Sequence, residues 1–148
     1  MICWDRLGGD TVIGVLEAGE APRLLELLDW VRTLLATWTP DADAAPTHPA
    51  LLSILALRRE RGHGEPECWP DVEVFDTAHA MMTLVLDTIP SEGAVLVLPS
   101  FNHVFAWLWA LTDLAAARPR DARWLEEMGT ALRTVANAER AQRVDHFW

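Results

Sequence analysis

Two histidines and a nearby aspartate are the side chains in this sequence with the clearest capacity for chemistry. His79 falls on the apolar line of a predicted helix, and Asp76 lies three residues earlier on a neighbouring face. A carboxylate at this spacing is close enough to orient an imidazole. An acid-x-x-His pair is also half of a type of metal site that helical bundles build from several helices. The alternative is a core histidine satisfied by one hydrogen bond, because buried polar groups are normally paired.

His103 is the second candidate, in the first turn of a predicted apolar helix, where the positive helix end disfavours a charged imidazole. If His79 and His103 converge across the core, the two rings could act as acid and base or bind a metal. Phe75, Met82 and Trp107 are apolar residues on the same two helices, and we predict that they line a ligand pocket. Spacing leaves open whether the rings meet, and local capping or packing of His103 is the alternative.

Tryptophan is unusually frequent, with eight residues in a chain that has no tyrosine. Exposed aromatic residues dominate binding hot spots, and aromatic residues also line apolar pockets. Most of the tryptophans are expected in the core, because each buries about 150–250 Å². Trp30 falls on the polar side of its helix and Trp148 ends the chain, so these two are the candidate interface residues.

The segment from His63 to Asp71 concentrates residue types that can bind metals, but their spacing matches no standard ligand pattern. An acidic solvated loop is the simpler interpretation. The sequence has no glycine-rich phosphate loop, no G-x-S-x-G motif and no His-Glu-x-x-His motif. We therefore expect neither a metal nor a cofactor, and the sequence leaves open whether the protein is an enzyme.

The chain of 148 residues is acidic, with 22 acidic residues, 12 arginines, no lysine and a formal net charge of −10. Arginine in place of lysine is typical of GC-rich bacterial coding. A negative surface repels phosphates, so we expect no nucleic-acid partner. Cys3 and Cys68 form no paired motif, and no signal peptide is recognisable, which together favour a cytoplasmic protein.

Apolar stripes at helical spacing, together with flanking prolines and glycines, predict five helices. Residues 101–112 carry no charge and place apolar side chains all around their helix, so we expect this helix at the centre of the molecule. A membrane span is the alternative for this stretch, but Pro99, Ser100 and Asn102 interrupt it. The predicted helices cover residues 22–38, 48–61, 71–89, 100–118 and 121 onward.

Two segments are ambiguous. Residues 1–20 could hold a short helix or a strand, but no good partner strand follows them. Residues 91–98 could be extended, although we favour a short helix that kinks at Pro99. The predicted fold is therefore all-α, a compact bundle of five to six helices around the central apolar helix, in one domain over residues 1–148.

The leading functional hypothesis is a small soluble helical domain that binds another protein, or itself, as a regulatory or accessory subunit. The alternative is a small-molecule-binding protein or enzyme whose tryptophan-lined pocket is served by His79, Asp76 and His103. A solvent-open pocket containing both histidines would favour the alternative. A solid core with an exposed apolar patch would favour protein binding.

Overall fold

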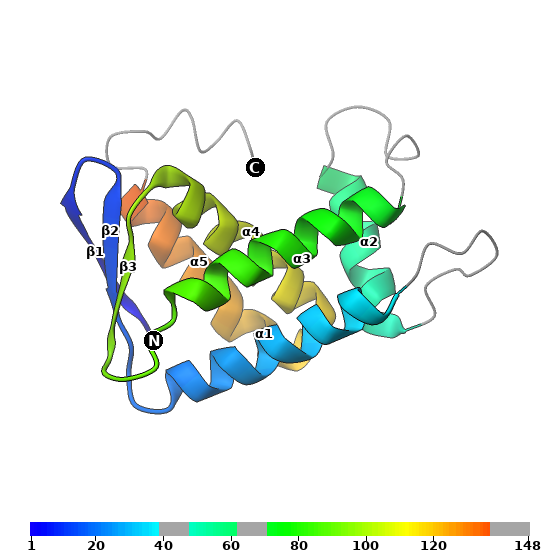
Figure 1. Ribbon diagram of the computed structural model, residues 1–148, viewed down its shortest axis with the longest axis horizontal. Coiled ribbons are helices and arrows are strands. Elements are labelled where there is room, and N and C mark those ends of the chain that lie inside the picture. Colours follow the sequence, from blue (N-terminus) through cyan, green and yellow to red (C-terminus); the bar gives the residue numbers. More distant parts are fainter. Residues whose placement is uncertain (39–47, 62–70, 137–148) are drawn as a thin grey trace.

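A small antiparallel sheet and five α-helices make up the part of the chain that the structure, a computed structural model, describes: residues 1–38, 48–61 and 71–136. The sheet lies at one end of the long axis, and α2 lies at the other end (Figure 1). The elements in chain order are β1 (Cys3–Gly8), β2 (Thr11–Val15), α1 (Glu20–Thr37), α2 (Pro49–Arg61), α3 (Asp71–Thr88), β3 (Val95–Leu98), α4 (Phe101–Ala117), the 3-10 turn η2 (Pro119–Asp121) and α5 (Ala122–Ala136).

The first four helices begin and end within two residues of the predicted positions, and α5 begins one residue after its predicted start. Helix α1 shows why. Gly19 has a positive φ of 86°, which a side chain would resist, and Pro22 fits the first turn, where no amide donor is needed. The residues that α1 buries form one stripe at helical spacing, as its sequence pattern predicts. They include Leu24, Leu28 and Val31.

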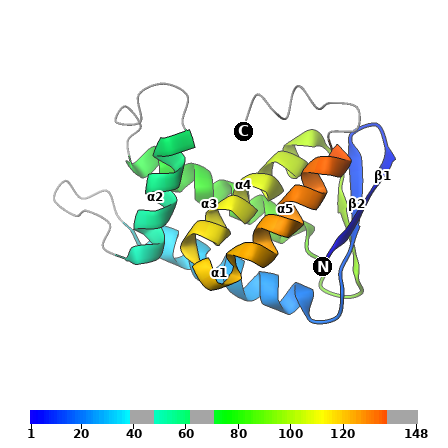
Figure 2. The same ribbon diagram turned by 180° about the vertical axis from the view of Figure 1, so that it is seen from behind.

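Helix α4 is the central element, as its uncharged sequence predicts. It contacts α1, α2, α3, α5 and β3. Figures 1 and 2 show α4 between α3 on one side and α5 on the other. Most of its side chains are buried, and Phe101, Phe105 and Trp109 form a half-buried line along one flank. None of the described helices is long and apolar enough to span a bilayer.

The predicted all-α fold is confirmed only in part: the described residues are mostly helical, but three segments pair as a sheet in the order β1-β2-β3. Residues 91–98 contain strand β3 instead of the favoured kinked helix, with Val12 opposite Leu98 and Val15 opposite Val95. Residues 1–20 contain the hairpin of β1 and β2 instead of a short helix. The expected lack of a partner strand was mistaken, since one partner of β2 precedes it and the other lies about 80 residues later.

The inner sheet face packs on the helices and depends on one glycine. Trp4 lies opposite Gly14 in the register of β1 and β2. A Cβ atom at Gly14 would lie 2.8 Å from Cζ3 of Trp4, so the indole ring occupies the space that a side chain would need. The Trp4 ring also packs edge-on against the ring of Trp107 on α4. The two ring centroids are 5.4 Å apart, and the ring planes make an angle of 80°. The contact between Trp4 and Trp107 joins the sheet to the central helix.

Candidate functional site

Of the two histidines predicted as chemical groups, His103 has a local side-chain partner. His103 Nδ1 and Ser100 Oγ are hydrogen bonded at 2.7 Å, and Ser100 is the residue that begins α4. The serine side chain thus bonds to the imidazole rather than to a backbone N–H. His79 is half-buried on α3, and Asp76, three residues earlier, is exposed. A local hydrogen bond to the first residue before α4 therefore accounts for the position of His103.

The register of α3 and α4 separates the two histidines. The indole N–H of Trp107 donates to Oγ1 of Thr88 at 2.8 Å. This hydrogen bond places Trp107 of α4 beside Thr88 at the end of α3. The two helices run in broadly opposite directions and cross at an angle (Figure 1). His79 lies nine residues from Thr88 in one direction, and His103 lies four residues from Trp107 in the other. At about 1.5 Å per residue, roughly 20 Å along the bundle separates them. The structure does not bring them together.

The apolar residues predicted to line a pocket belong to the packed core. Phe75, Met82 and Trp107 are at most 2% exposed. Phe75 meets the edge of Trp38 with 4.8 Å between ring centroids. Within the described ranges, no group of three or more His, Cys, Asp or Glu side chains is close enough to hold a metal ion.

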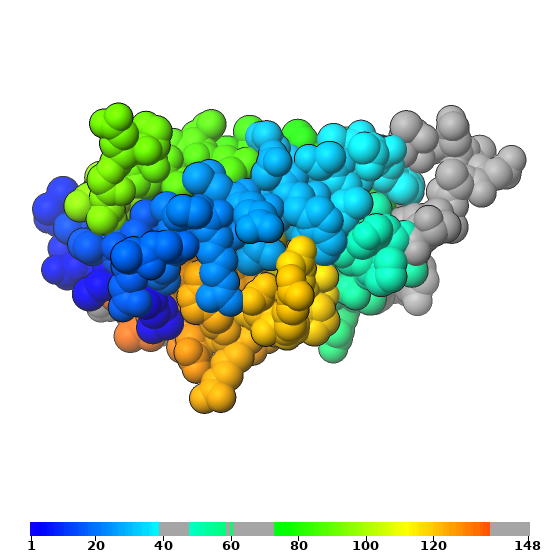
Figure 3. Space-filling model, turned by 90° about the horizontal axis from the view of Figure 1, so that it is seen from below, coloured from blue at the N-terminus to red at the C-terminus, as the bar shows by residue number. Residues whose placement is uncertain are grey.

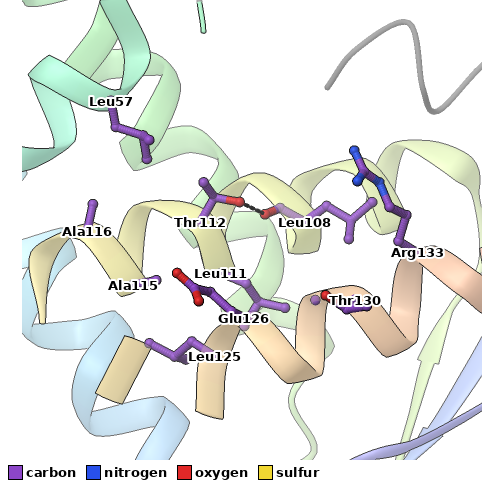
Figure 4. Close-up of a pocket in the computed structure, with 11 residues that line it drawn as sticks. Leu57, Leu108, Leu111, Thr112, Ala115, Ala116, Leu125, Glu126, Thr130 and Arg133 are labelled. Atoms are coloured by element: carbon purple, nitrogen blue, oxygen red, sulfur yellow. Dashed lines mark hydrogen bonds between the residues drawn. The ribbon is translucent and has the colours of Figure 1, made fainter. Parts of the chain in front are cut away.

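A groove of about 410 Å³ lies instead between α2, α4 and α5, away from all of these residues (Figure 4). Its lining on the α4 side is apolar except for Thr112, and Glu126, Thr130 and Arg133 lie along the α5 side. Gly129 contributes no side chain there, which leaves part of this volume open. Among the described residues, its ionisable lining side chains are Glu126 and Arg133, and neither candidate histidine reaches it. The lining residues are Leu57, Leu108, Leu111, Thr112, Ala115, Ala116, Leu125, Glu126, Gly129, Thr130 and Arg133.

The sequence interpretation missed a buried ion pair between α2 and α4. Nε and Nη2 of Arg58 donate to the two carboxylate oxygens of Asp113 at 2.9 and 2.6 Å. Asp113 is fully buried, Arg58 is 8% exposed, and the guanidinium carbon lies 4.0 Å from the centre of the Trp109 ring. The sequence did contain one indication of this pair. Asp113 is the first charged residue after the uncharged run of residues 101–112, on a helix expected to be buried.

Of the two tryptophans predicted to form an interface, the structure describes one, Trp30. Trp30 is half-buried, and the guanidinium of Arg118 lies over its ring at 4.2 Å. The ring of His48 approaches it from another side at 5.9 Å. These contacts occupy Trp30 within the molecule. Trp148 lies outside the described residues, as do His63 and Cys68.

The outer sheet face is where apolar side chains meet solvent. We use this name for the outward-pointing residues of the three strands. Leu7 is 68% exposed, Val95 55%, Val15 46% and Val97 45%. These four are the majority of the seven large apolar residues that are exposed within the described ranges. Val15 and Val95 are direct neighbours across the strands. The outward-pointing residues are Cys3, Asp5, Leu7, Thr11, Ile13, Val15, Val95 and Val97.

Strand β3 also leaves backbone groups unused at the sheet edge. The N–H of Leu16 donates to the carbonyl of Ala94 at 2.7 Å, which marks 16 and 94 as a hydrogen-bonded pair. Because such pairs alternate in an antiparallel ladder, Leu96 also faces β2, whereas the N–H and C=O groups of Val95 and Val97 point away from it. In the described part of the chain no strand lies beyond β3.

The other edge of the sheet is protected. The backbone N–H of Arg6 in β1 bonds to Oδ1 of its neighbour Asp5 at 2.8 Å. The Arg6 guanidinium donates to the carbonyl of Gly9 at 2.7 Å, and the register shifts between Arg6 and Gly8. Charges and irregular pairing are devices that keep an edge strand from pairing with another chain. Strand β3 has neither.

Comparison with protein-family models, curated proteins and solved structures finds no match.

Proposed function

We propose that this protein is a cytoplasmic, protein-binding accessory domain whose contact surface is the outer sheet face. The observation that carries the proposal is the cluster of exposed valines across β2 and β3. Soluble monomers rarely expose large contiguous apolar patches, and such patches are typical of interaction sites. On the described helices the only exposed large apolar residues are Leu25 and Leu52.

The charges around the outer sheet face indicate what kind of partner fits it. Asp5, Glu17 and Glu92 are exposed acidic residues on or beside the sheet. An apolar centre with a charged rim is the usual anatomy of a protein interface. A partner surface with an apolar centre and basic residues around it would be complementary, and association would weaken as salt is raised.

The enzyme or small-molecule alternative gains no support from this arrangement. His79 and His103 are far apart along the bundle, and Phe75, Met82 and Trp107 fill core positions. The groove between α2, α4 and α5 contains none of them.

The test compares two charged substitutions at equally exposed positions. Val15 on the outer sheet face and Leu52 on α2 are each 46% exposed. We expect Val15→Lys to weaken capture of a protein partner from cell extract at least tenfold, which corresponds to about 1.4 kcal/mol. Leu52→Lys should leave capture unchanged. The readout is quantitative mass spectrometry of proteins retained by each immobilised variant.

The proposal would be overturned if wild type and Val15→Lys retained the same proteins in equal amounts. Loss of the captured protein with Leu52→Lys but not with Val15→Lys would place the contact surface on the helices instead. Far-ultraviolet circular dichroism of each variant confirms that its fold is intact.

A further inference from the structure

We propose that β3 pairs antiparallel with β3 of a second copy of this chain, so that two three-stranded sheets become one continuous sheet. This inference extends the proposed function, because the joined sheet would present two outer sheet faces side by side to one partner. It rests on the backbone geometry of β3, which the proposed function does not use.

The free edge of β3 is self-complementary. Val95 and Val97 carry the outward-pointing backbone groups and lie symmetrically on either side of Leu96. A twofold axis between the two copies of Leu96 would place each Val95 opposite Val97 of the other copy. Both pairs would then be of the hydrogen-bonded type, so every outward N–H and C=O of these residues would gain a partner. The same patch serves both copies, as an isologous dimer requires.

The segment around β3 is free of the repulsion that the net charge of −10 would otherwise cause. Residues 89–100 contain one charged residue, Glu92, which precedes the strand. Like charges directly opposite each other destabilise a sheet, whereas valine pairs stabilise it. Within the two hairpin strands, the charged residues lie on β1, at the opposite edge of the sheet, and β2 carries none. A second copy can therefore pair with β3 without placing acidic side chains directly opposite each other in the paired strands.

The edge is also accessible. Residues 91–95, Val97 and Pro99 are exposed. Figure 3 shows the light green segment that leads into β3 as a projecting corner beside the blue hairpin. Gly93, with a φ of 81°, precedes the strand and Pro99 follows it, which limits the pairing to a few residues. Such a short contact falls at the low end of specific interface sizes, so the dimer should be weak and concentration-dependent.

The decisive variant is Val97→Pro. The N–H of Val97 points away from β2, so proline removes a donor from the free edge without breaking a hydrogen bond of the chain's own sheet. Val97→Thr is the matched control, because it retains the N–H and the branched shape. By sedimentation equilibrium of the full chain we expect wild type and Val97→Thr to dimerise with rising concentration. Val97→Pro should have at least tenfold weaker association.

A second measurement does not depend on any substitution. In wild type, hydrogen exchange at the amides of Val95 and Val97 should slow as concentration rises, because dimerisation protects them. The amides of Leu96 and Leu98, which face β2, should show no comparable change. This result keeps the inference testable even if Val97→Pro fails to fold.

Each contrary outcome identifies what is wrong. A chain that is monomeric at all concentrations overturns the pairing, and so does a dimer that survives in folded Val97→Pro. Val15→Lys separates this inference from the proposed function, because Val15 lies on the central strand and its substitution leaves the β3 edge intact. A monomer that still captures a partner through Val15 would refute the dimer alone. A β3 dimer with no Val15-dependent partner would refute the proposed function alone.

Discussion

Gly14 and Gly129 show how the same residue type is constrained by different neighbours. Gly14 lies under the ring of Trp4, at a distance that no Cβ atom tolerates. Gly129 lies in the middle of α5, where a Cβ atom would be 3.8 Å from Cδ1 of Leu111, an ordinary van der Waals contact. The first glycine is required by packing, and the second is not.

Gly14→Ala should destabilise the protein by about 1–3 kcal/mol, because the new methyl group must displace a buried indole that is also packed on Trp107. Urea denaturation monitored by tryptophan fluorescence measures the change. In the background of Trp4→Leu the same substitution should cost much less. Equal costs in both backgrounds would show that the ring is not the obstacle.

Gly129→Ala should have the opposite sign and stabilise the protein by roughly 0.5–1 kcal/mol, because alanine restricts the unfolded chain and favours the helix. The added methyl group would extend into the groove between α2, α4 and α5 without a close contact. The midpoint of urea denaturation is again the measurement. A loss of stability would mean that the volume beside Gly129 is not free.

At the scale of elements, the buried pair of Arg58 and Asp113 joins α2 to the central helix. Asp113→Ala should cost about 3–5 kcal/mol, because it leaves a guanidinium buried without its counter-ion. Replacing both residues with apolar ones of similar size, as Arg58→Met with Asp113→Leu, should cost far less. Chemical denaturation of the single and double variants measures the difference.

An exposed pair provides the control for this prediction. Arg123 and Glu127 are bonded at 3.2 Å on the surface of α5, and Glu127→Ala should change stability by less than about 0.5 kcal/mol. If Asp113→Ala were equally mild, water would have to reach the buried pair in solution.

The helices were predictable because their signals are local. Apolar stripes, Pro22 near the start of α1 and Pro90 after α3 each act within a few residues. The sheet was not predictable in the same way. Strand β1 contains Asp5, Arg6 and a glycine, which are poor strand formers, and the continuous apolar run of β3 does not alternate. Only pairing with β2 across about 80 residues makes β3 a strand.

At the scale of the whole molecule, the sequence indicated the type of residues in the candidate sites but not their distances. His79 and His103 lie on neighbouring helices. The hydrogen bond between Trp107 and Thr88 fixes how these helices are aligned along their axes, and in that alignment the two histidines are far apart. The position of Trp30 on the polar side of its helix predicted an exposed ring that could bind a partner. In the structure, the guanidinium of Arg118, at the end of α4, covers this ring. The outer sheet face was missed because its strands were missed.

The contrast between the two sheet edges has a consequence for how far assembly can go. If β3 joins two copies, both ends of the resulting sheet are β1 strands, and each is blunted by the Asp5 and Arg6 contacts and the shifted register near Gly8. Neither end offers a template for a third molecule. Assembly then stops at the dimer. The apolar strand β3, which in a free state could pair with further copies and begin a fibril, is already paired in the dimer.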